Sequence, residues 1–164
     1  MKVREFKVGE KVVYPAHGVG VIEEVQSRKH SGAEMQFYTL RIIDTDMKIM
    51  IPTAKADAVG LRRVIGKDMV SKVYKVLREK RVRVDQATWN RRYREYTEKI
   101  KTGAGLEIAA VLRDLFMLKG DKELSFGERK MLDTARNLLV KELAIAKAHS
   151  EEKIMEELRT IFGH

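Results

Sequence analysis

Residues 36–52 read QFYTLRIIDTDMKIMIP, and this stretch decides the fold class of the N-terminal part of the chain. Residues 36–43 are rich in aromatic and β-branched side chains, which is typical of a strand. The polar run Asp44-Thr-Asp46 predicts a turn. A second strand is predicted after it for residues 47–51 and is stopped by Pro52, because proline has no N–H to donate to a strand ladder. We therefore expect two strands joined by a tight turn.

The predicted strand after this turn has two different faces. Met47, Ile49 and Ile51 lie on one face, and Met50 lies on the other. If the isoleucine face belongs to the core, Met50 points outward beside Pro52, where an adaptable methionine suits a partner surface. The alternative is that both faces are partly covered by another strand or domain.

Three further strands are expected around this pair. They are predicted for residues 11–14, 19–25 and about 59–64, with turn residues at 15–18 and 30–32. Five short strands with tight turns predict a small, strongly bent β-barrel of the SH3 or Tudor type, which spans residues 1–63.

From residue 67 onward the spacing of apolar residues becomes helical. A capping box at Ser125 and Glu128 marks the start of one long helix, because each side chain can satisfy a backbone donor near the other. Five helices with short loops predict a compact helical domain over residues 67–164, so the fold class is α+β. The expected helices are residues 68–79, 88–101, 105–118, about 125–148 and 150–162.

Positive charge is concentrated in the middle of the chain. The net charge is +9, and residues 64–103 contain 12 basic and 5 acidic side chains. Residues 1–63 contain 11 and 8, and residues 104–164 contain 10 and 11. A concentrated excess is the electrostatic footprint of a phosphate-binding surface. Apolar runs are too short to cross a membrane, so the sequence does not favour a membrane partner.

Residues 85–96, DQATWNRRYREY, lie within this basic region and hold the only tryptophan, Trp89. Thr88 is a candidate N-cap for the helix that follows. The arginines Arg91, Arg92 and Arg94 come within two turns of Trp89. Cations that grip phosphates beside a flat apolar ring suit a protein that holds distorted DNA.

A second interpretation of the same residues is structural. Trp89, Tyr93, Tyr96 and Ile100 are spaced by four, three and four, and therefore share one face of a helix. Such a stripe is usually core, because large aromatic side chains are highly buried on average. The arginines would then form a solvated face.

The sequence shows no motif for catalysis. It contains no cysteine, and its four histidines have no metal-ligand spacing. A Walker A loop, a nucleophile elbow and an HExxH motif are all missing from the sequence. We therefore expect a protein that is not an enzyme and uses no metal, cofactor or small-molecule substrate. The N-terminus shows no secretory signal, which predicts a cytoplasmic location.

Several blocks in order, separated by near-constant spacings, resemble the CarD/CdnL family of bacterial transcription regulators, and above all its CdnL branch. The resemblance covers essentially the whole chain. The matching blocks are FKVGEKVVYPAHG (6–18), MIP (50–52), VGLR (59–62), WNRRY (89–93), VLRDL (111–115) and LSFGERKML (124–132).

This resemblance implies a Tudor-like N-terminal domain that binds the β subunit of RNA polymerase. Arg28, Met50 and Pro52 fall at polymerase-contact positions of the family. Some relatives carry arginine where this chain has Met50, so the contact at Met50 is expected to be apolar.

The resemblance also implies that the helical domain contacts promoter DNA at the upstream edge of the −10 element and stabilises the open complex. Trp89 would wedge into the minor groove and hinder collapse of the bubble. The basic residues expected at the DNA are Arg91, Arg92, Arg94, Arg129 and Lys130.

Two alternatives accompany this expectation. The first is a general nucleic-acid-binding protein of nucleoid or RNA-binding type, in which the barrel touches nucleic acid; the lower charge of residues 1–63 argues against it. The second is an enzyme of unrecognised type, which a pocket with convergent titratable groups would support. The Tudor-like module also occurs in transcription-repair coupling factors. Those proteins are large helicases, and the sequence has no ATPase motif.

Overall fold

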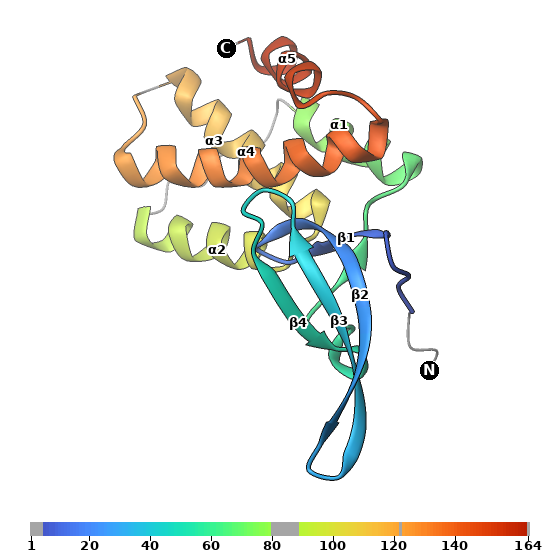
Figure 1. Ribbon diagram of the computed structural model, residues 1–164. Coiled ribbons are helices and arrows are strands. Elements are labelled where there is room, and N and C mark those ends of the chain that lie inside the picture. The colour runs from blue at the N-terminus through green and yellow to red at the C-terminus, as the bar shows by residue number, and fades with distance from the viewer. Residues whose placement is uncertain (1–4, 80–88, 122, 164) are drawn as a thin grey trace. The chain divides into compact units, whose positions relative to one another are not determined.

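The structure, a computed structural model, describes residues 5–79, 89–121 and 123–163. Two compact units divide the chain, Met1–Val64 and Ile65–His164. The first unit consists mainly of strands and the second of helices (Figure 1). This arrangement confirms the predicted α+β class.

A five-stranded antiparallel sheet forms the first unit. Its strand order is β4-β3-β2-β1-β5, which is the order of a small barrel that is open between β4 and β5. The strands are β1 (Lys11–Tyr14), β2 (Gly18–His30), β3 (Ala33–Ile42), β4 (Lys48–Pro52) and β5 (Arg62–Arg63).

Several strand boundaries differ from the prediction, and the largest differences are in the β2–β3 hairpin and in β5. β2 continues to His30 rather than ending near residue 25, and it pairs with β3 as far as His30↔Ala33, so the two strands form a long hairpin (Figure 1). β5 has only two residues, because the chain forms a turn over residues 56–60 after a 3-10 helix at Thr53–Lys55. Gly60 also takes a φ of 81°, which makes a turn where the sequence suggested a strand.

The core of the first unit lies on one face of this sheet. Ile51 is 3% exposed and packs among the apolar side chains of β2 and β3. Tyr38 is also buried, and its hydroxyl accepts a hydrogen bond from the backbone N–H of Phe6 (3.1 Å). Met47, expected on the same face as Ile51, is instead exposed, because β4 begins at Lys48 and Met47 precedes it.

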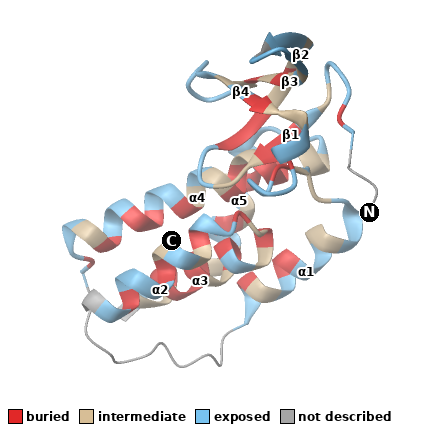
Figure 2. Ribbon diagram, turned by 90° about the horizontal axis from the view of Figure 1, so that it is seen from below, coloured by how far each residue is buried: buried red, intermediate tan, exposed pale blue. Residues whose placement is uncertain are grey.

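In its described residues, the second unit consists of five helices. Their buried faces meet around α3, which contributes Ala109, Leu112 and Leu115 to the core (Figure 2). The helices are α1 (Lys67–Arg78), α2 (Trp89–Lys101), α3 (Gly105–Asp121), α4 (Phe126–Lys147) and α5 (Glu151–Phe162).

The predicted capping box at the start of α4 is confirmed. The Ser125 backbone N–H donates to Glu128 Oε1 (2.9 Å), and the Glu128 backbone N–H donates to Ser125 Oγ (3.2 Å). These reciprocal bonds satisfy two of the donors that a helix N-terminus leaves without intrahelical partners. They fix the residue at which α4 begins, and therefore which side chains its first turn presents.

Candidate protein-binding and nucleic-acid interfaces

The register of the sheet brings the three expected polymerase contacts onto one face. Because paired residues in a ladder point to the same side, and alternate residues of a strand share a face, Arg28, Met50 and Pro52 all point to one side of the sheet. The pairs that establish this are Arg28↔Met35, Thr39↔Met50 and Phe37↔Pro52. The core residues Tyr38, Leu40 and Ile51 point to the opposite side. We call this outer surface of β2, β3 and β4 the β4 face.

β4 is an edge strand of this sheet. Within the described residues it pairs with β3 alone, so its other side presents backbone N–H and C=O groups without a neighbouring strand. An exposed edge of this kind is a template for the addition of a strand from another protein. Met50 is 40% exposed on the same strand, which confirms the prediction that it points outward.

The N-terminal half of α2 presents two of its three arginines to solvent. Arg91 and Arg94 are exposed, and Arg91 makes only a loose pair with Glu95, whose Oε1 lies 3.7 Å from Arg91 Nε. Such an exposed pair contributes little, so Arg91 is available to a stronger anion. The Thr88 N-cap and the side chain of Trp89 lie outside the described residues, so both remain predictions.

Arg92 departs from its expected place at the DNA. Only 8% of the residue is exposed, and its Nη1 lies 3.7 Å from Oε2 of Glu128, which is 1% exposed. Arg92 also forms a hydrogen bond with the hydroxyl of Tyr96, one helical turn away. The guanidinium is thus directed into the helical unit, where a buried charge requires a partner.

The apolar stripe predicted for α2 is wrong at Tyr93, which is 49% exposed. Tyr96 and Ile100 are buried as expected. The buried face therefore consists of Arg92, Tyr96 and Ile100, at intervals of four residues. This rotation of the helix leaves Tyr93 outside the core, in the same part of α2 as Arg91 and Arg94.

The first turn of α4 presents a second group of exposed side chains. Arg129 and Lys130 are exposed, as a DNA contact requires. Phe126, which the sequence analysis did not single out, is 75% exposed. The capping box is a sequence signal from which this exposure could have been predicted. With Ser125 as the N-cap, Phe126 is the first helical residue and lies outside the buried stripe that includes Met131 and Leu132.

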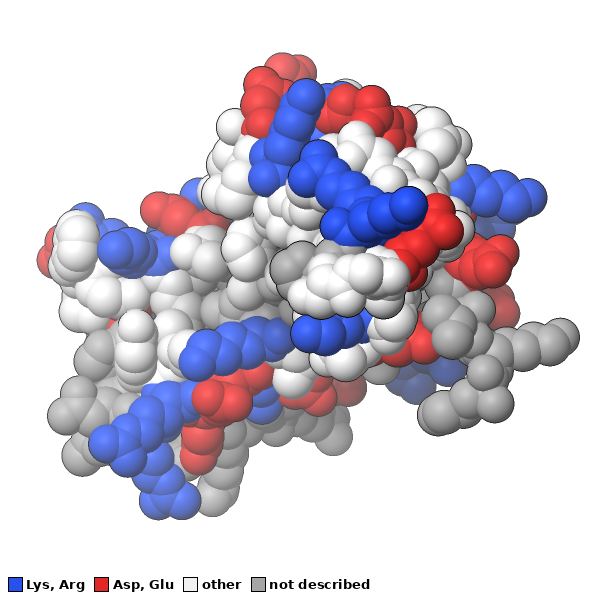
Figure 3. Space-filling model, turned by 60° about the horizontal axis from the view of Figure 1, so that its bottom comes forward, with Lys and Arg blue, Asp and Glu red and all other residues white. Residues whose placement is uncertain are grey.

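The ion pair of Arg92 with Glu128 brings these two groups together. Arg92 is preceded by Arg91, and Glu128 is followed by Arg129, so exposed cations from distant parts of the sequence are carried on turns that contact each other. We use the name α2–α4 surface for the exposed side chains near this ion pair on the two helices, which are Arg91, Arg94, Phe126, Arg129 and Lys130. On the face drawn in Figure 3, Lys and Arg side chains lie among Asp and Glu side chains, and no single uninterrupted basic face is visible in that view.

A buried polar network ties α2 to α3 and α1. The Tyr96 hydroxyl donates to Asp114 Oδ2 (3.3 Å), and Arg113 Nη2 donates to Asp114 Oδ1 (3.0 Å). Arg113 Nη1 also donates to Glu79 Oε2 (2.8 Å), just beyond the end of α1. Burial raises the pKa of Tyr96 above its ordinary value, and the Asp114 carboxylate raises it further. The phenol is therefore a neutral donor at physiological pH.

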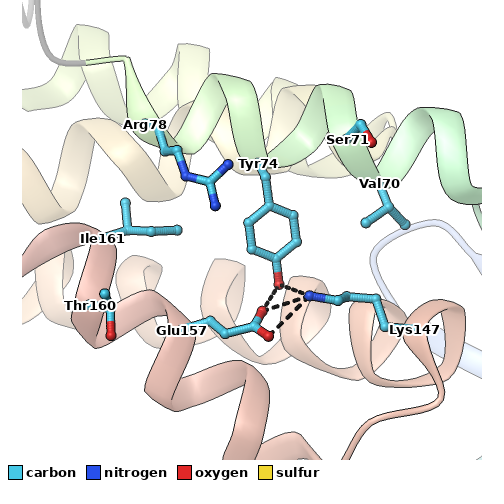
Figure 4. A pocket seen from close by; sticks show the side chains of 8 residues that line it. All are labelled: Val70, Ser71, Tyr74, Arg78, Lys147, Glu157, Thr160 and Ile161. Atoms are coloured by element: carbon cyan, nitrogen blue, oxygen red, sulfur yellow. Dashed lines mark hydrogen bonds and ion pairs between the residues drawn. The ribbon is translucent and has the colours of Figure 1, made fainter.

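A cavity of about 810 Å³ in the helical unit lies between α1, α4 and α5 (Figure 4). Glu157 accepts a hydrogen bond from the Tyr74 hydroxyl and two from Lys147 Nζ, at 2.9 and 3.0 Å. Burial alone would raise the pKa of Glu157, but the hydrogen bonds from Lys147 and Tyr74 outweigh it and hold the pKa below its ordinary value. An ionised carboxylate with both partners satisfied holds three helices together, and is poorly suited to act as a general base.

Other kinds of site are not found in the described parts of the chain. Residues 5–79, 89–121 and 123–163 contain no group of three or more His, Cys, Asp or Glu side chains that could hold a metal ion. In the same residues, none of the helices combines the length and the apolar character needed to cross a membrane.

Comparisons with known proteins match both units. Residues 6–65 match the family model described as the CarD-like/TRCF RID domain, and residues 72–159 match the model of the CarD C-terminal domain. A relative in Bacillus subtilis (strain 168), YdeB, provisionally named a transcription factor, is 34% identical over 152 residues. That alignment covers 91% of this chain and 97% of the relative.

Two solved N-terminal domains from Myxococcus xanthus are also similar in sequence. CdnLNt is 42% identical, with 41% of this chain and 93% of that chain covered and a TM-score of 0.34. The 72-residue N-terminal domain of CarD is 30% identical, with 36% and 79% covered and a TM-score of 0.32.

The two family models together define a transcription factor whose N-terminal domain is of the RNA polymerase-interacting type. The chain belongs to the CarD/CdnL family, as the sequence blocks predicted.

Proposed function

We propose that the protein binds the β subunit of RNA polymerase through the β4 face and the free edge of β4. It also contacts promoter DNA at the upstream edge of the −10 element through the α2–α4 surface and Trp89. By holding both partners it stabilises the open complex, and it performs no catalytic step.

The observation that carries the polymerase contact is the common orientation of Arg28, Met50 and Pro52. These residues come from β2 and β4, yet the register places them on one outer face. Beside them runs an edge strand that is free to accept a strand from a partner. Hydrogen bonds along the edge would supply affinity, and Met50 would supply an apolar contact that adapts to the partner.

The DNA contact rests on exposed cations from two helices together with an exposed ring. Arg91 and Arg94 of α2, with Arg129 and Lys130 of α4, can each meet a phosphate. Phe126 adds an apolar side chain of the kind that proteins insert between base steps. Trp89 is proposed as the main wedge on the strength of the family resemblance.

Binding to DNA alone is expected to be weak, because only a few phosphates are contacted and acidic side chains lie among the cations. Attachment to polymerase offsets this weakness, since a tethered surface acts at a high effective concentration. The DNA contact is therefore expected to form only when the protein is also attached to polymerase.

Co-purification with RNA polymerase tests the polymerase contact most directly. We expect Met50→Ala to reduce the amount of polymerase that is retained. Met47→Ala is the matched control, because Met47 is 47% exposed, close to the 40% of Met50, yet lies outside β4. Full retention by a folded Met50→Ala, Pro52→Ala double variant would move the interface elsewhere.

A further inference from the structure

Arg92 and Glu128 form a buried ion pair at the point where the two halves of the α2–α4 surface meet. The residues are 8% and 1% exposed, and Arg92 Nη1 lies 3.7 Å from Glu128 Oε2. The exposed cations Arg91 and Arg129 are their direct neighbours in sequence. One internal contact thus joins the two turns that carry the cations expected to meet DNA.

Both partners of the pair are themselves held in place. Glu128 uses its other oxygen, Oε1, to accept the Ser125 backbone N–H (2.9 Å). Arg92 also bonds the Tyr96 hydroxyl, which in turn donates to Asp114 of α3. The ion pair therefore connects the N-terminal cap of α4 to the network that fixes α2 on α3.

Stability alone is a poor explanation for such a pair. Removing two charges from water costs several kcal/mol per ion, and apolar residues of similar volume are often as stable or more so. Apolar packing, however, is non-directional. A buried charge pair whose partners are held by other bonds favours one relative placement of the two helices that it joins, because moving either charge away leaves the other without a counter-charge.

We propose that Arg92 and Glu128 are positioning residues, which set the spacing of the cations on α2 against those on α4 so that both reach DNA phosphates together. The proposal rests on the DNA contact proposed above. Arg92 is buried and does not touch DNA in this proposal. The contact is made by the exposed arginines that are its neighbour and the neighbour of Glu128 in sequence, Arg91 and Arg129.

Spin labels can measure this spacing directly, because the chain contains no cysteine of its own. Cysteines introduced at the exposed positions Glu98 of α2 and Asn137 of α4 would carry the labels for pulsed electron paramagnetic resonance. The variant is Arg92→Met with Glu128→Gln. It removes both charges, and the introduced glutamine can still accept the Ser125 N–H, since a capping box functions with glutamine.

We expect the double variant to remain folded, with a broader or shifted distance distribution. At a responsive promoter its open complexes should decay faster than with the wild-type protein. A folded variant with the wild-type distribution and the wild-type open-complex lifetime would overturn the proposal. If the double variant does not fold, the isosteric single variant Glu128→Gln provides the same two readouts with the same interpretation.

Arg91→Met is the matched control. It removes one exposed cation from the same helix, so it should weaken the DNA contact and leave the distance distribution unchanged. A distribution that broadened equally in this control would mean that the charge pair has no special role, and would also overturn the proposal. Should the wild-type protein fail to lengthen open-complex lifetime, the proposed function would be wrong, while the distance distributions would still decide whether the pair sets the spacing.

Discussion

Met50 and Ile51 are neighbours in β4 but belong to opposite faces of the sheet, with exposed fractions of 40% and 3%. Replacing each with alanine should therefore have opposite consequences. Ile51→Ala creates a cavity and is expected to lower the free energy of unfolding by about 2–5 kcal/mol. Met50→Ala should change it by less than about 0.5 kcal/mol and reduce polymerase binding. Thermal unfolding and a pull-down on the same two variants check both parts; a large loss of stability in Met50→Ala would place its side chain in a core.

Trp89→Ala distinguishes the wedge from the core interpretation of α2. Loss of a core tryptophan typically costs about 3–5 kcal/mol. A wedge acts only when DNA is open, so its removal should leave the melting temperature nearly unchanged. We expect polymerase binding to persist and the open complex to decay faster, which a competitor-challenge lifetime assay measures. A strongly lowered melting temperature with a normal lifetime would return Trp89 to the core.

Arg91→Ala tests whether the α2–α4 surface meets phosphates. Loss of one phosphate contact lowers the slope of log K against log salt by about one, and weakens binding similarly across DNA sequences. Lys153→Ala is the control, because Lys153 is an exposed cation on α5, outside the α2–α4 surface. Equal effects of the two substitutions would indicate a response to net charge, without a localised contact.

Glu157 predicts a pH dependence of stability. Its pKa in the folded protein lies below the ordinary value of 4.5, through the hydrogen bonds from Lys147 and Tyr74 that outweigh burial. The folded state therefore binds this proton less readily than the unfolded state does. The resulting stabilisation is present above pH 4.5 and is lost as the pH falls through the folded-state pKa. Melting temperatures between pH 7 and pH 3 should fall less steeply for Glu157→Gln than for wild type, with the exposed neighbour Glu156→Gln as the control.

The order and type of the elements could be predicted from sequence, because their periodicities are local properties. The alternation around Ile51 indicated a half-buried strand, and the Ser125–Glu128 capping box indicated where α4 begins. The length of the β2–β3 hairpin was missed, since local composition does not show where cross-strand pairing ends. Pairing through to His30 depends on residues of the opposite strand.

The candidate site was only partly predictable for a similar reason. Hydrophobicity favoured Tyr93 for the buried face of α2, yet Arg92 occupies it. The carboxylate that makes this burial possible belongs to Glu128, on a helix that begins only at Phe126. Tertiary context of this kind overrides local preference, and no spacing rule within α2 could reveal it.

The free edge of β4 also affects whether two copies of the protein can pair through their sheets. Long, flat, apolar edges promote edge-to-edge aggregation, whereas short edges with charged residues and proline resist it. β4 has only five residues, begins with the exposed Lys48 and ends with Pro52. If two β4 edges from different copies came together, their lysines would repel, their prolines would supply no N–H donor, and few hydrogen bonds could form along five residues. The edge of β4 can thus accept a complementary segment, while its short length, its lysine and its proline make pairing with a second copy of itself unfavourable.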